Sequence, residues 1–244
     1  GLPNGVLAAN LIAIDHLYLD DKGKGQRGAW PAMTPQWYAD TLSAILDHGD
    51  PSAFHALLDK LGPTKRRPTV AALLDSPQAW QALSEGYGRM PQTAFISYFW
   101  AWRALVGGLL RTLVSPLPRA RIYHSVSTGY AGLVAARAAH DSGRPVIVTE
   151  HGIYSNERRV EILMADWINN SIDTGLDFTD ERQDVRDFWA DAFESFARLA
   201  YSAADDVIAL YGDNNAFQQA LGADSRKLTV VPNGVDVDRF STLP

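Results

Sequence analysis

Residues 145–149 read PVIVT, and the polar sequence Glu150-His151-Gly152 follows at once. Such a nearly continuous β-branched run is typical of a strand that is buried on both faces of a parallel sheet. The second half of the chain holds three similar runs, at 121–125 (RIYHS), 206–210 (DVIAL) and 227–231 (KLTVV). Helical patterns lie between the runs, at 129–140, 185–204 and 214–221. This alternation predicts an α/β fold with a parallel sheet and right-handed crossovers.

The first half of the chain follows another pattern, because most of it is predicted to be helical. Three sites place a capping side chain before a proline: Thr34-Pro35, Asp50-Pro51 and Ser76-Pro77. The side chain accepts a backbone N–H, and proline suits the first helical position because its missing donor would be unpaired there. A strand candidate at 10–19 precedes these helices. We therefore expect a helical elaboration attached to the sheet.

The composition narrows the classes of function. The 244 residues carry 22 Lys and Arg against 28 Asp and Glu, which gives a net charge of −6. This acidic balance argues against bulk binding to nucleic acid or to anionic lipid. The chain has no cysteine, so disulfides, thiol nucleophiles and thiolate metal ligands are excluded.

One stretch, 94–114, is rich enough in apolar residues to be tested as a membrane span. Arg103 and Arg111 interrupt it, and its longest uncharged run is far shorter than the ~20 residues that a spanning helix needs. We predict a buried helix instead. The start of the chain has neither an initiator Met nor the charged and apolar regions of a signal peptide, so we expect it to begin inside a longer protein.

Candidate functional residues follow the first predicted strand of the sheet. Ligands of open parallel sheets bind beyond the carboxyl ends of the strands, and Ser127, Thr128 and Gly129 stand there, at the start of a helix. Free backbone N–H groups, two hydroxyls and a glycine suit a sugar hydroxyl or an anionic group. On a simpler interpretation, Ser127 or Thr128 only caps the helix.

The next strand delivers Glu150, His151 and Gly152 to the same edge. A carboxylate or imidazole at the rim of a low-dielectric sheet can orient or polarise a substrate, and Gly152 removes bulk beside the histidine. A histidine that is hydrogen-bonded for purely structural reasons is the alternative.

Charged residues continue this segment as Glu157, Arg158 and Glu161. On a helix the two glutamates would share one face, and the Arg158 guanidinium could hold a phosphate or carboxylate. A solvated charged face is the alternative. The chain lacks the glycine motif of dinucleotide-binding proteins, the P-loop, the hydrolase nucleophile elbow and the HExxH metal motif. No metal is predicted, and a metal-assisted hydrolase with His124, Glu150 and His151 is a minor alternative.

Several segments resemble one family. Residues 149–154 (TEHGIY), followed by Glu157-Arg158, resemble the PelF-type enzymes, a branch of glycosyltransferase family 4. Residues 198–201 (RLAY) and 231–240 (VPNGVDVDRF) match the same family in the same order. The second string is typical of family 4 in general, whereas EHGIYxxER points to the PelF branch.

This resemblance implies the GT-B architecture, in which two Rossmann-like domains, with helices on both faces of each sheet, face each other across a cleft. Residues 1–240 would form the N-terminal, acceptor-side domain without its first strand and glycine-rich loop. Residues 231–244, with Asn233, Gly234 and Asp236, would begin the linker to a second domain.

The implied reaction is a retaining sugar transfer without a metal or other cofactor. The donor would be a nucleotide-sugar, expected to be a UDP-sugar, held mainly by the second domain. His151 would be the catalytic residue near the donor sugar, and the substrate-binding residues would be Ser127, Thr128, Gly129, Glu150, Gly152, Glu157 and Arg158.

The expected product is a Pel-like exopolysaccharide, made in the cytoplasm from a saccharide acceptor. The expected partner is an inner-membrane polysaccharide synthase complex, which would hold the protein at the membrane surface, and the isolated chain would be inactive. In the alternative function the domain is non-catalytic and docks on that complex through aromatic residues such as Trp30, Trp37 and Trp80.

Overall fold

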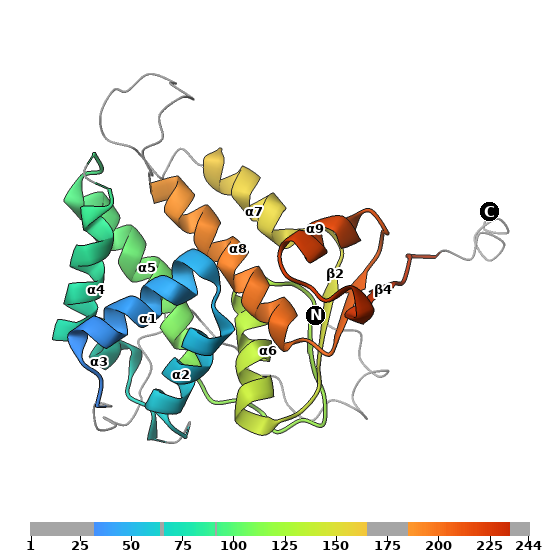
Figure 1. Ribbon diagram of the computed structural model, residues 1–244, viewed down its shortest axis with the longest axis horizontal. Coiled ribbons are helices and arrows are strands. Elements are labelled where there is room, and N and C mark those ends of the chain that lie inside the picture. Colours follow the sequence, from blue (N-terminus) through green and yellow to red (C-terminus); the bar gives the residue numbers. More distant parts are fainter. Residues whose placement is uncertain (1–31, 64–65, 91, 165–184, 235–244) are drawn as a thin grey trace, which may run out of the picture.

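The computed structural model describes residues 32–63, 66–90, 92–164 and 185–234 (Figure 1). The strand predicted at 10–19, Trp30 and Asp236 therefore lie outside the described residues. The helices are α1 (Pro35–His48), α2 (Pro51–Leu61), α3 (Val70–Leu74), α4 (Pro77–Gly88), α5 (Phe95–Val114), α6 (Gly129–Ser142), α7 (Tyr154–Leu163), α8 (Val185–Ala203) and α9 (Asn214–Ala220), with a short 3₁₀ turn, η2 (Ser225–Lys227). The strands are β1 (Tyr123–Ser125), β2 (Val146–Glu150), β3 (Asp206–Ala209) and β4 (Leu228–Val230).

The four strands form one parallel sheet in the order β1-β2-β3-β4. Each strand is separated from the next by at least one helix, as right-handed crossovers require. All four strands lie where the apolar runs predicted them. The predicted Rossmann-like α/β fold with a helical elaboration is therefore confirmed.

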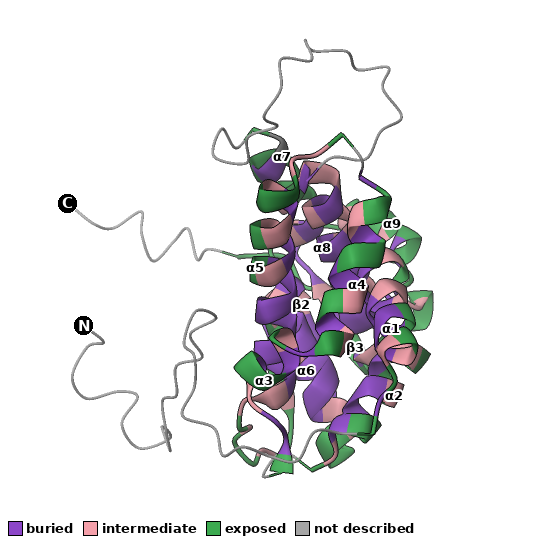
Figure 2. Cartoon of the chain, turned by 90° about the vertical axis from the view of Figure 1, so that its left-hand side faces the viewer, coloured by how far each residue is buried: buried purple, intermediate pink, exposed green. Residues whose placement is uncertain are grey.

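The two faces of β2 differ in burial. Val146, Val148 and Glu150 are buried, whereas Ile147 and Thr149 between them are half-buried. The buried face packs on α6 and α8, and its apolar cluster includes Ala135 and Ala197 from those helices. Figure 2 shows exposed residues on the outer sides of the helices and buried ones toward the inside. A layer of helices on the opposite face stays a prediction.

The predicted helix caps are present in the helical first half. Thr34, Asp50 and Ser76 each accept a backbone N–H of the first turn, at 3.2, 2.8 and 3.0 Å. Helix α2 ends at Leu61, and Gly62 follows it as the cap with its backbone at φ 68°. The sequence signals for these helix starts were local, and tertiary packing did not override them.

The apolar stretch 94–114 forms the helix α5, as predicted. Leu105, Val106, Leu109, Leu110 and Leu113 are each fully buried against neighbouring helices. No helix in the described part of the chain is long and apolar enough to cross a membrane.

Two buried arginines join the end of α5 to the rest of the molecule. Arg137 of α6 donates to the carbonyls of Thr112 and Ser115 at 2.7 and 2.5 Å. Arg67 donates to the carbonyl of Leu113 at 2.5 Å. Both guanidinium groups also pair with Asp141, at 3.1 Å from Arg137 and 2.8 Å from Arg67. The last carbonyls of a helix have no partner within it, so these contacts satisfy acceptors that would otherwise be buried alone.

Replacing Arg137 by methionine tests this junction. The variant keeps most of the buried volume but removes the Arg137 donor from the Thr112 and Ser115 carbonyls and one partner from Asp141, so we expect the free energy of unfolding to fall by about 3–5 kcal/mol. Urea denaturation followed by circular dichroism measures the change.

The matched control is Arg144→Met, at an exposed position shortly after the same helix, which should change stability by no more than about 0.5 kcal/mol. Equal, small effects for both variants would contradict a structural role for the Arg137 contacts.

Candidate functional site

The carboxyl ends of the four strands lie at one edge of the sheet, because the strands are parallel. Glu150 pairs with Ala209 of β3, and Ala209 pairs with Val230 of β4. The residues that follow each strand therefore meet at this edge, which places Ser127, His151 and Asn233 on the same side of the molecule. This is the side on which open parallel sheets bind ligands.

Glu150 is the most deeply buried acidic residue at this edge, with 1% of its surface exposed. Its Oε1 accepts a hydrogen bond from the Thr128 hydroxyl at 3.2 Å. Its Oε2 accepts from the Tyr201 hydroxyl and, at 3.1 Å, from Nε2 of Gln218. Tyr201 and Gln218 belong to α8 and α9, and Thr128 immediately precedes α6, so one carboxylate ties three helices to the tip of β2. A buried carboxylate is stable only with such partners.

The contacts of Glu150 settle one alternative for Thr128. Thr128 precedes the first residue of α6, but its hydroxyl makes no capping bond and turns to Glu150 instead. The capping interpretation is therefore wrong for Thr128. Both side chains are almost fully buried, so the arrangement gives them an internal role, and their contact with a substrate stays a prediction.

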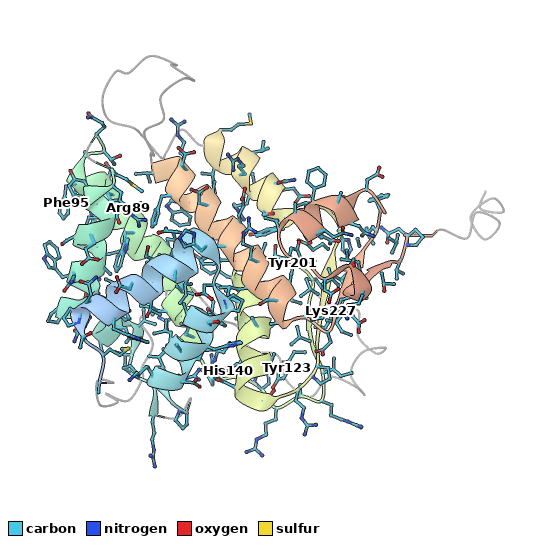
Figure 3. All side chains as sticks on the ribbon, viewed as in Figure 1. Arg89, Phe95, Tyr123, His140, Tyr201 and Lys227 are labelled. Carbon is cyan, nitrogen blue, oxygen red and sulfur yellow. The ribbon has the colours of Figure 1, made fainter. Side chains whose placement is uncertain are left out.

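Tyr201 donates to Glu150 from the protein interior, with 1% of its surface exposed. Burial raises the pKa of its hydroxyl, and the adjacent Glu150 carboxylate raises this pKa further. The hydroxyl therefore keeps its proton at physiological pH and donates a hydrogen bond to the Glu150 carboxylate. In Figure 3, Tyr201 lies between α8 and the strands.

His151 immediately follows Glu150 and is exposed. No residue in the described part of the chain hydrogen-bonds to its imidazole. The ring is therefore exposed directly after a central strand, and its contact with a substrate stays a prediction. Tyr211, 59% exposed, follows β3 at the same edge.

Gly129, by contrast, is covered by another part of the protein. Its backbone is left-handed, at φ 64°, and a Cβ there would come within 2.6 Å of the Tyr154 ring. The glycine thus makes room for Tyr154 of α7 rather than for a ligand in this conformation. Ser127 is half-buried, and its carbonyl accepts from the Ser125 hydroxyl at 2.6 Å. Substrate contacts of both residues stay predictions.

The segment after His151 forms helix α7, and the predicted rim residues meet there. A Cβ on Gly152 would overlap the Glu157 carboxylate, so this side chain lies directly over the glycine. Arg158 donates to the Tyr154 hydroxyl at 2.8 Å and pairs with Glu161 at 2.8 Å. The guanidinium of Arg158 is therefore partly engaged within α7, and its capture of a ligand anion is untested.

The described residues contain no group of three or more His, Asp and Glu that could hold a metal ion. Nε2 of His124 instead contacts the Thr149 hydroxyl at 2.8 Å, and the Glu150 carboxylate is fully engaged. The alternative of a metal-assisted hydrolase therefore has no cluster of metal ligands in the described part of the chain.

Sequence reasoning missed the partners Tyr201 and Gln218. Tyr201 stands on the apolar face of α8, in step with Phe193 and Ala197, and a phenol on a buried face needs a polar partner. That signal was present in the sequence. For Gln218, on the short helix α9, no local signal existed.

The comparison with protein families gives one match. Residues 6–226 match the model of the family described as "Domain of unknown function (DUF3492)". The match spans most of the 244 residues, so the chain belongs to this family. Neither the curated proteins nor the solved structures yielded a match.

Replacing Tyr201 by phenylalanine tests the Glu150 network. The ring and its packing remain, but Glu150 loses one of three donors, so we expect the free energy of unfolding to fall by about 1–3 kcal/mol. Thermal and urea denaturation give the value. Tyr211→Phe is the control, since this phenol is exposed and its loss should change stability by less than about 0.5 kcal/mol. A Tyr201 variant as stable as the control would show that the buried carboxylate does not need the phenol.

Proposed function

We propose that this chain is the acceptor-side domain of a retaining, nucleotide-sugar-dependent glycosyltransferase of family 4, of the PelF type, which builds an exopolysaccharide. The resemblance of residues 149–158 and 231–240 to that family motivates the assignment. The observation that carries it is the exposed imidazole of His151 at the carboxyl end of β2. A Rossmann-like parallel sheet presents its functional residues at this edge.

The position of His151 follows from the buried neighbour beside it. Glu150 turns into the protein and is held there by three donors. His151 directly follows the last residue of β2 and is exposed, whereas Glu150 is buried. The contacts of Glu150 hold the backbone next to His151 in place. A group that contacts a transition state needs such a fixed position.

In the proposed reaction the donor is a nucleotide-sugar, expected to be a UDP-sugar, and a second domain supplies most of its contacts. His151 hydrogen-bonds to the transferred sugar, where positive charge develops as the bond to the diphosphate breaks. Ser127 and Glu157 border the acceptor side. Asn233 and Gly234 follow β4 at the same edge and are exposed, in keeping with a passage toward that second domain.

The test is His151→Ala in the full-length protein. We expect the variant to lower kcat by about 100-fold or more, because it removes a contact made in the transition state. Release of UDP from a panel of UDP-sugars, measured with an acceptor saccharide, gives the rates.

The matched control is His48→Ala, which removes an exposed histidine at the end of α1, away from the sheet. The control should retain wild-type kcat. Unchanged turnover in the His151 variant would remove this residue from the active site and take away the main support for the assignment.

A second candidate function is docking on a membrane-embedded polysaccharide synthase. One observation favours it: large apolar side chains on α4 and α5 are exposed, with Trp80 at 56%, Ile96 at 60% and Trp100 at 62%. Phe95 contacts Trp80 and, through Phe99, continues to Trp100. Contiguous exposed apolar groups of this kind mark interaction surfaces. Of the other predicted aromatics, Trp37 is half-buried against the core.

The double variant Trp80→Ser, Trp100→Ser tests this surface. We expect the full-length variant to leave the membrane fraction when the synthase is co-expressed, because its apolar contact area is lost, while sugar transfer persists. Phe217→Ser, which removes an aromatic residue of α9 that is 53% exposed, is the control and should fractionate as the wild type does. Unchanged fractionation of the double variant would exclude this surface as the docking site.

A further inference from the structure

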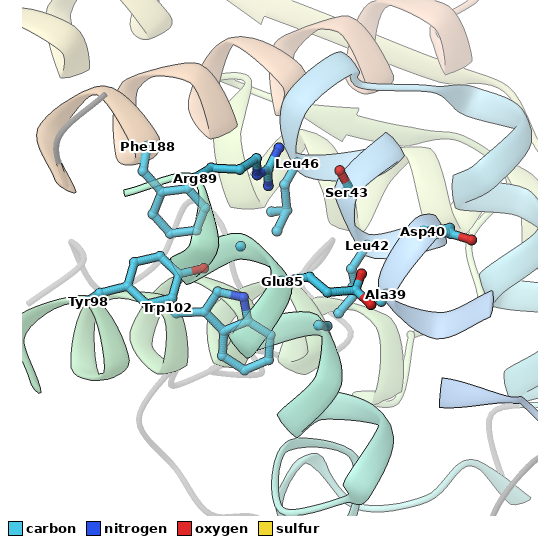
Figure 4. Close-up of a pocket in the computed structure, with 12 residues that line it drawn as sticks. Ala39, Asp40, Leu42, Ser43, Leu46, Glu85, Arg89, Tyr98, Trp102 and Phe188 are labelled. Carbon is cyan, nitrogen blue, oxygen red and sulfur yellow. The ribbon is translucent and has the colours of Figure 1, made fainter. Parts of the chain in front are cut away.

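A cavity of about 220 Å³ lies in the helical part of the molecule, apart from the carboxyl edge of the sheet. It is enclosed by residues of α1, α4, α5 and α8 together with Arg89, as Figure 4 shows. At about 30 Å³ for each water molecule, this volume would hold about seven waters, which is the size of a single sugar ring. None of its lining residues belongs to the strand ends.

Two hydrogen-bond donors lie on the inner wall of this cavity. Trp102 and Tyr98 of α5 are 3% and 1% exposed, and Figure 4 shows the indole nitrogen and the phenol oxygen on the side of the cavity. No described residue hydrogen-bonds to either atom. Neither atom is among the fully buried unpaired atoms of the described residues, so both open onto the cavity, where a ligand could accept hydrogen bonds from them.

The charges at the mouth restrict the chemistry of a ligand. Asp40, Glu85 and Arg89 are exposed residues that line the cavity. Two carboxylates disfavour an anion, and the guanidinium of Arg89 disfavours a cation. Arg89 also pairs with Asp47 at 2.5 Å, which holds it at this position. A neutral ligand with several hydroxyls matches this mixture, because each hydroxyl both donates and accepts.

A glycine in α4 leaves space for the Tyr98 hydroxyl. Gly86 lies inside α4, where glycine is less favourable than alanine by about 1 kcal/mol. A Cβ at this position would overlap the Tyr98 hydroxyl. Burial raises the pKa of Tyr98, so the hydroxyl stays protonated and can donate.

We propose that the cavity between α1, α4, α5 and α8 binds one monosaccharide unit, with the Trp102 indole and Tyr98 hydroxyl donating to its oxygens and Glu85 accepting from a hydroxyl. The aromatic rings of Tyr98 and Phe188 supply the apolar wall that sugar sites share with other small-molecule sites. This site is separate from His151 and does not depend on the proposed transfer.

The experiment is a titration of the full chain with glucose, galactose and N-acetylglucosamine, followed by saturation-transfer NMR and by Trp fluorescence. We expect at least one sugar to bind. Tyr98→Phe and Trp102→Phe should each weaken that binding by about five- to tenfold, since each removes one hydrogen bond to the ligand. Neither phenylalanine leaves a protein partner unsatisfied, so Tyr98→Phe should unfold at the same denaturant concentration as the wild type.

Tyr87→Phe is the matched control: it removes a neighbouring phenol that bonds to the Thr93 carbonyl and does not line the cavity. It should leave sugar affinity unchanged. The proposal is overturned if no sugar binds at millimolar concentration, if binding survives both cavity variants, or if glycine, a zwitterion probe, binds there in place of the sugars. Loss of transfer in His151→Ala with intact sugar binding here would show that the two sites are independent.

Discussion

The buried carboxylate of Glu150 is the constraint on which the carboxyl edge of the sheet depends. It lies in a low-dielectric interior with 1% exposure, and its partners come from three different helices. A shift of β2 by one residue would turn Glu150 to the other face and bring His151 to the buried one. The need to pair one carboxylate thus fixes the register of the strand, the positions of α6, α8 and α9, and the exposure of the histidine.

Helix α6 is held by polar contacts at both ends. At its start, Thr128 reaches Glu150; near its end, Arg137 reaches the last carbonyls of α5. Arg137 also pairs with Asp141 within the same helix. Helix α6 therefore connects the helical half of the chain to the sheet.

The sequence was sufficient for elements with local signals and insufficient for contacts between distant segments. The four strands and the caps at Thr34, Asp50 and Ser76 were predictable because a few adjacent residues determine each of them. The burial of Glu150 could also be predicted, because alternate residues of a strand point to the same face and Glu150 is in step with Val146 and Val148. Its partners Tyr201 and Gln218 were not, because they lie 51 and 68 residues away. The cavity likewise combines side chains from four helices, which no local pattern brings together.

Polar groups with hydrogen-bond partners inside the protein differ in role from polar groups that have none. Glu150, Thr128 and Arg137 are buried with their partners in place, and polar groups in that condition stabilise one conformation. His151, Trp102 and Tyr98 differ, because no described residue hydrogen-bonds to their polar side-chain atoms. Other buried polar atoms of the described residues also lack a hydrogen-bond partner, among them Nε of Arg111 and the Ser155 hydroxyl, so an unmet donor does not by itself define a site. His151, Trp102 and Tyr98 differ from those atoms because they border open space, at the tip of β2 and at the cavity between the helices, and we propose a hydroxyl-rich ligand for both places.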